Sequence, residues 1–86
     1  MDLVALRGRI DDIDDSLVKL ICERMRVSGD IARYKSQNGL AVRCPDRERE
    51  KMDDVLGKTD EGLRRYVGEL FTLIIELSCA YQETIL

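Results

Sequence analysis

The sequence contains no histidine and no tryptophan, and it has one proline and one phenylalanine among 86 residues. The side chain that most often acts as a general base near neutral pH, or as a metal ligand, is therefore missing. The three cysteines are far apart and form no CxxC pair, so we expect neither a disulfide framework nor a zinc site. This use of cysteine favours a reducing compartment, the cytoplasm.

The chain also lacks a dominant positive charge and a long apolar run. Its net charge of −3 argues against a nucleic-acid partner. No apolar segment approaches the length of a membrane span, and the opening Met1-Asp2 does not resemble a signal peptide. We expect a soluble protein with a single domain over residues 1–86. Because a chain this small buries only about 60% of its unfolded surface, self-association is favoured.

Apolar residues recur at alternating spacings of three and four from Leu3 onward, which predicts one long helix ending near Asn38-Gly39. A second helix is predicted to begin at Pro45 and to end at Gly57. A third follows, capped by Thr59 or Asp60. The sequence thus predicts an all-α fold of three helices, the first about 50 Å long.

Several polar residues occupy positions that these patterns reserve for apolar side chains. Arg24 interrupts the stripe of the first helix, and Lys35 projects from nearly the same face eleven residues later. Ser78 and Gln82 continue the apolar face of the third helix. Six residues are candidates for one cavity: Arg24, Lys35, Arg47, Glu48, Ser78 and Gln82. Three cations, a carboxylate and two neutral hydrogen-bonding groups suit a small polyanion that carries a hydroxyl.

Each residue also has a structural interpretation. An unpaired charge in an apolar seam costs several kcal/mol, so Arg24 could instead pair with Glu23, Asp30 or the acidic cluster 11–15. Lys35 could be a solvated residue near a helix C-terminus. The polar residues of the second and third helices could lie on exposed faces.

Arg7 is a further cation, early in the first helix. Seventeen residues, or about 25 Å of helix, separate it from Arg24, too far for one small ligand to bridge within the same chain. If the first helices of two chains cross antiparallel, Arg7 of one lies beside Arg24 of the other. The acidic cluster 11–15 would then face basic residues of the second chain.

Four segments, "LRGRIDDID", "ERMRVSGDIARYK", "CPDRERE" and "LFTLIIELSCAYQ", resemble the all-helical class of chorismate mutase over almost the whole chain. The resemblance implies an intertwined homodimer with two equivalent sites that share residues from both chains. It also implies the Claisen rearrangement of chorismate to prephenate, a step toward phenylalanine and tyrosine that needs no cofactor.

The resemblance assigns roles to the candidate residues. Arg7 of the partner chain, aided by Lys35, would bind the enolpyruvyl carboxylate, and Arg24, aided by Ser78, the ring carboxylate. Lys35 and Gln82 would donate to the ether oxygen, where negative charge grows in the transition state.

Around the ring hydroxyl, the resemblance implies that Glu48 accepts a hydrogen bond and that Arg47 completes the electropositive lining. Cys44 departs from the family, which commonly has aspartate there. Cysteine is a poor N-cap, so a loss of about 1 kcal/mol of local helix stability is expected. A contact through the backbone N–H of Cys44 would survive the change.

Two alternatives to the mutase function remain open from the sequence. One is removal of pyruvate from isochorismate on the same scaffold. The other is a non-catalytic helical module for dimerisation or regulation.

Overall fold

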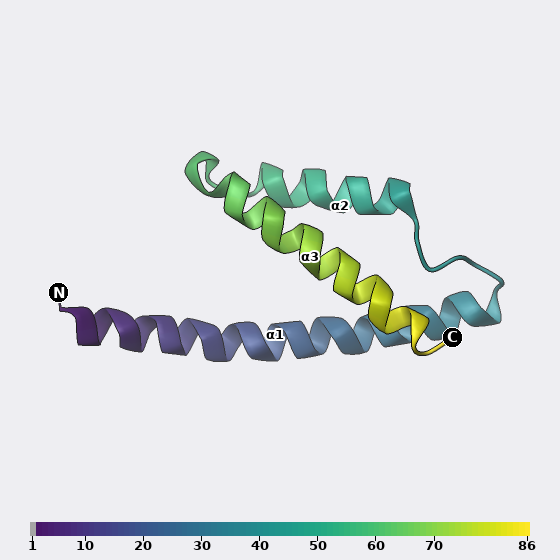
Figure 1. Ribbon diagram of the computed structural model, residues 1–86, viewed down its shortest axis with the longest axis horizontal. Coiled ribbons are helices and arrows are strands. Elements are labelled where there is room, and N and C mark those ends of the chain that lie inside the picture. Colours follow the sequence, from purple (N-terminus) through teal and green to yellow (C-terminus); the bar gives the residue numbers. More distant parts are fainter. Residues whose placement is uncertain (1) are drawn as a thin grey trace.

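The computed structural model describes residues 2–86, and within that range it contains three α-helices, one 3-10 turn and no strand. The helices are α1 (Leu3–Gln37), α2 (Pro45–Gly57) and α3 (Arg64–Glu83), and the turn η1 (Glu61–Leu63) leads into α3. In Figure 1, α1 is a long rod, and α3 returns diagonally across its C-terminal half, with α2 on the other side of α3. The predicted all-α fold with a long first helix is confirmed.

Local interactions explain where α1 begins and ends. The Asp2 carboxylate accepts a hydrogen bond from the backbone N–H of Ala5 at 2.7 Å, which caps the first turn. At the other end, Gly39 has a φ of +66°, and the N–H of Leu40 donates to the carbonyl of Lys35 at 2.9 Å. This left-handed glycine closes the last turn, as the Asn38-Gly39 pair predicts.

The start of α2 agrees with the sequence, but the start of α3 does not. Pro45 occupies the first turn of α2, and the Cys44 side chain makes no capping hydrogen bond. The prediction that Thr59 or Asp60 caps the third helix through its side chain is wrong. The Thr59 hydroxyl donates to the Val55 carbonyl at 2.7 Å, and Asp60 precedes η1 without a side-chain hydrogen bond. The chain therefore enters α3 through the 3-10 turn.

The core of the single chain is small. No large side chain within residues 2–86 is fully buried, and the buried apolar residues are Ala32, Val42 and Cys79. In contrast, the large side chains of the apolar stripe of α1 are exposed, with Ile10 at 56% and Leu20 at 60%. The residues of this stripe are Leu3, Leu6, Ile10, Ile13, Leu17 and Leu20. None of the helices in this range is long and apolar enough to span a bilayer. One face of α1 is thus left without a partner in its own chain.

Candidate active site

A cavity of about 260 Å³ lies between the C-terminal half of α1, the linker that follows it, the start of α2 and the end of α3. All residues predicted for the site except Arg7 line this cavity: Arg24, Lys35, Cys44, Arg47, Glu48, Ser78 and Gln82. Arg7 lies near the N-terminus of α1, and it is absent from the lining of the cavity in its own chain. Its role across a dimer stays a prediction.

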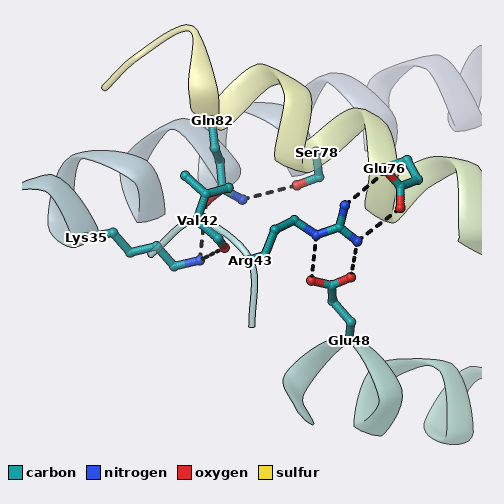
Figure 2. Close-up of polar contacts among 7 residues, drawn as sticks. All are labelled: Lys35, Val42, Arg43, Glu48, Glu76, Ser78 and Gln82. Carbon is teal, nitrogen blue, oxygen red and sulfur yellow. Dashed lines mark hydrogen bonds and ion pairs between the residues drawn. The ribbon is translucent and has the colours of Figure 1, made fainter. Parts of the chain in front are cut away.

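A run of hydrogen bonds crosses the cavity wall around Lys35 (Figure 2). The Lys35 ammonium donates to the Val42 carbonyl at 2.5 Å and to Gln82 Oε1 at 3.4 Å. Gln82 Nε2 in turn donates to Ser78 Oγ at 3.5 Å, and Ser78 Oγ lies 2.5 Å from Ser28 Oγ. Because an ammonium has three N–H bonds, these contacts leave Lys35 one donor for a ligand.

Gln82, Ser78 and Ser28 are all buried, so the interpretation of Ser78 and Gln82 as surface residues is wrong. Sequence reasoning missed Ser28 and the Val42 carbonyl. Ser28 could have been found, because it lies four residues after Arg24 and seven before Lys35, on the same helical face. The backbone carbonyl of a linker residue leaves no comparable pattern in the sequence.

Arg24 is half-buried at the cavity, and its guanidinium forms no ion pair or side-chain hydrogen bond with residues 2–86. Asp30 pairs instead with Arg33 at 3.0 Å. The structural interpretation, in which a carboxylate of the same chain neutralises Arg24, is therefore not what the chain adopts. All five N–H bonds of Arg24 are available for an anionic ligand.

Glu48 is held by an arginine that sequence reasoning did not place in the site. Arg43 Nε donates to Glu48 Oε2 at 3.0 Å, and Nη2 donates to Oε1 at 2.5 Å. The same guanidinium makes two hydrogen bonds to Glu76, each of 3.0 Å (Figure 2). The hydrogen bonds from Arg43 lower the pKa of Glu48, so its carboxylate is ionised.

Arg47 stands at the edge of the cavity. Its guanidinium pairs with Glu50 at 3.0 Å, and both side chains are largely exposed. The interpretation of this segment as an exposed charged face thus holds for the Arg47–Glu50 pair, although Arg47 also lines the cavity.

Two thiols face the cavity. Cys44 is exposed at the start of α2, whereas Cys79 is buried on α3. Burial raises the pKa of the Cys79 thiol, so it is a neutral group near neutral pH. Within residues 2–86, no cluster of three His, Cys, Asp or Glu side chains is placed to hold a metal ion.

Cations, hydroxyls and an amide therefore converge on one small cavity, with an ionised carboxylate at one side. Such a set can bind a small dianion and donate hydrogen bonds to an oxygen that gains negative charge during a reaction.

Comparison with known proteins identifies the family. The model of the family described as chorismate mutase type II matches residues 6–83, a range that includes every candidate site residue from Arg7 to Gln82. The chain belongs to the type II chorismate mutase family. The resemblance seen in the four sequence segments is thereby confirmed, and neither alternative function is favoured.

Individual relatives are named chorismate mutase, either alone or as one part of a bifunctional protein. A chorismate mutase from Methanocaldococcus jannaschii is 33% identical over 83 residues, covering 94% of this chain and 84% of that protein. Bifunctional chorismate mutase/prephenate dehydratases from Buchnera aphidicola subsp. Acyrthosiphon pisum and Escherichia coli K12 are 37% and 35% identical over 86 residues, 98% of this chain. The chain spans only 22% of the length of these two relatives. No solved structure matches the chain significantly.

Proposed function

We propose that this chain catalyses the rearrangement of chorismate to prephenate in the synthesis of phenylalanine and tyrosine. The observation that carries the proposal is the meeting of Lys35 and Gln82 beside Arg24, which has no ion pair within residues 2–86, in one cavity of a type II chorismate mutase fold. The proposed enzyme is a cytoplasmic homodimer.

The reaction is intramolecular, so the protein needs no nucleophile and no proton transfer. The ether C–O bond breaks as a new C–C bond forms, and negative charge develops on the ether oxygen. The remaining N–H of Lys35 and the amide N–H of Gln82 donate to this oxygen in the transition state. Gln82 Nε2 makes only a long contact, 3.5 Å, with Ser78 Oγ, so little is lost when it turns to the substrate. Hydrogen bonds to the ether oxygen that strengthen as its negative charge grows lower the activation barrier.

The two carboxylates of chorismate hold it in the compact form that reacts. Arg24 and Ser78 bind the ring carboxylate, while Arg7 of a second copy binds the enolpyruvyl carboxylate, aided by the positive charge of Lys35. The exposed apolar stripe of α1 supports this pairing, because a second copy would cover it.

The ring hydroxyl is recognised at the part of the cavity wall that the start of α2 forms. The ionised Glu48 carboxylate accepts its hydrogen bond, and the backbone N–H of Cys44 is a donor to the hydroxyl oxygen. Arg47 adds positive potential at the edge. These assignments require only side chains and backbone that line the cavity.

The test follows chorismate loss and prephenate formation by the purified chain. We expect Lys35→Ala to lower kcat by about 100- to 1,000-fold, as removal of a donor to a developing oxyanion does. Circular dichroism should show unchanged helix content. Lys19→Ala, on the same helix but outside the cavity lining, is the matched control and should keep wild-type turnover.

Isochorismate is assayed in parallel, with salicylate as the readout. Formation of salicylate without prephenate would replace the mutase by a pyruvate lyase. If Lys35→Ala keeps the wild-type kcat, the assignment of the ether-oxygen donors is wrong.

A further inference from the structure

The linker between α1 and α2 carries an arginine that joins two helices at the cavity. Arg43 presents its Nε–Nη2 edge to Glu48 on α2 and its Nη1–Nη2 edge to Glu76 on α3. Both pairings are bidentate, the geometry in which a guanidinium best fixes a carboxylate. Figure 2 shows Arg43 between the two acidic side chains. The linker, α2 and α3 thus meet at one guanidinium.

The two carboxylates differ in their relation to the cavity. Glu48 lines it, and its side chain is only 22% exposed, whereas the Glu76 side chain is 55% exposed and is absent from the lining. Each Glu48 oxygen accepts one hydrogen bond from Arg43 and keeps a second lone pair. Glu48 can therefore accept a hydrogen bond from a ligand hydroxyl while it stays paired with Arg43. Glu76 can affect the ligand only through Arg43.

Charged groups from every neighbouring element surround Glu48. Arg43 in the linker favours its ionised form most, followed by the backbone N–H of Cys44 and by Lys35 on α1. On α3, Cys79 is a neutral thiol, and the Glu76 carboxylate is itself paired with Arg43. The cations of α2 that line the cavity are Arg47 and Lys51. The only one of these side chains that hydrogen-bonds the Glu48 carboxylate is Arg43, within residues 2–86.

We propose that Arg43 is a positioning residue, which holds Glu48 ionised and aimed at the ring hydroxyl of the substrate, and that Glu76 fixes Arg43 in that place. This inference rests on the proposed function, and it adds Arg43 and Glu76 as residues that support the contact between Glu48 and the hydroxyl. A carboxylate held in this way accepts hydrogen bonds and donates none, so the site selects a substrate with a hydroxyl at this position.

The first test compares Arg43→Gln, Arg43→Lys and Glu76→Gln. In Arg43→Gln, we expect kcat/KM to fall by about 10- to 100-fold, because displacement of a group that contacts the substrate lowers the rate by up to about this factor. The acid limb of the pH profile should move to higher pH, because Glu48 loses the group that lowers its pKa most. Arg43→Lys keeps the charge but not the bidentate contact, so its acid limb should stay nearer that of the wild type while kcat/KM remains reduced. Glu76→Gln should lower kcat/KM less than Arg43→Gln.

Arg49→Gln is the matched control. Arg49 also lies next to Glu48 in the sequence, but it pairs with Asp46 on the exposed side of α2 and does not line the cavity. Its pH profile and kcat/KM should equal those of the wild type. An unchanged kcat/KM and acid limb in Arg43→Gln would overturn the proposal.

A double-mutant cycle separates positioning from a general structural role. In a Glu48→Gln background, Arg43→Gln should cause no further loss of kcat/KM, because the group it positions is gone. An equal loss of kcat/KM in the wild-type and Glu48→Gln backgrounds would mean that Arg43 only stabilises the linker, and the proposal would fail.

A third readout does not depend on turnover. NMR titration of the Glu48 carboxyl carbon should show a higher pKa in Arg43→Gln than in the wild type, and an unchanged pKa would refute the inference. If the wild-type chain forms no prephenate, the proposed function fails, while this titration still tests whether Arg43 governs Glu48.

Discussion

Ile10 belongs to the exposed apolar stripe of α1 and lies in the N-terminal half of that helix. In the proposed homodimer, the stripe of one copy is covered by the other. Ile10→Ala removes three of the four side-chain carbons from this surface without touching the cavity. Dimerisation should weaken while the fold of each chain is retained.

The exposed fraction of Ile10 sets the size of the effect. Complete burial of an isoleucine side chain stabilises a protein by about 1.5–3 kcal/mol. Since 56% of Ile10 is still exposed in the single chain and alanine retains the β-carbon, the loss is about 1 kcal/mol per copy. A symmetric dimer contains the substitution twice, which gives about 2 kcal/mol, or an increase in Kd of about 30-fold.

Sedimentation equilibrium over a range of concentrations measures this Kd directly. Because each proposed site needs Arg7 of a second copy, kcat per chain should fall on dilution in parallel with the dimer fraction. Cys22→Ala is the control, since Cys22 is exposed on α1 outside the apolar stripe, and its Kd should match the wild type. A wild-type Kd for Ile10→Ala, or full turnover by the monomer, would refute the shared-site reasoning.

Two further predictions concern stability. Gly29→Val should lower the free energy of unfolding by about 1–3 kcal/mol, because even a Cβ there would lie 3.1 Å from Ile85 Cδ1 and 3.4 Å from Tyr81 Cε2. Gly8→Val, with nothing within 4 Å, should show no such loss in urea unfolding. Cys44→Asp should add about 1 kcal/mol by capping α2 and raise Tm by about 4 °C in a thermal melt, whereas Cys44→Ala should leave Tm unchanged. An unchanged Tm for Cys44→Asp would show that the N-cap of α2 does not limit stability.

The helices were predictable because their signals are local. A repeat of three and four, a left-handed glycine at Gly39 and a proline at Pro45 determine α1 and α2 within their own segments. The cavity residues of α1 and α3 were predictable for a related reason. Arg24 and Gln82 interrupt apolar patterns, and such interruptions are visible without knowledge of the fold.

The position of Arg43 was not predictable in this way. It lies in a linker without periodicity, and its two partners are five and 33 positions away. A chain rich in arginine and glutamate offers many such pairings, and only the packing of α2 on α3 selects this one. The 3-10 turn before α3 was not predicted. The Thr59 hydroxyl donates to the Val55 carbonyl instead of capping α3, and the position of Thr59 in the sequence does not decide between these two interactions.

The contact between Ser28 and Ser78 joins positions 50 residues apart, and it has a consequence for the order of events during synthesis. Translation proceeds from the N-terminus, so α1 emerges from the ribosome before α3 does. The apolar stripe is then already present, while the binding cavity still lacks one wall. Only when the last helix has emerged and folded back can Gln82 meet Lys35, so the apolar stripe of a nascent chain is exposed before the cavity is complete.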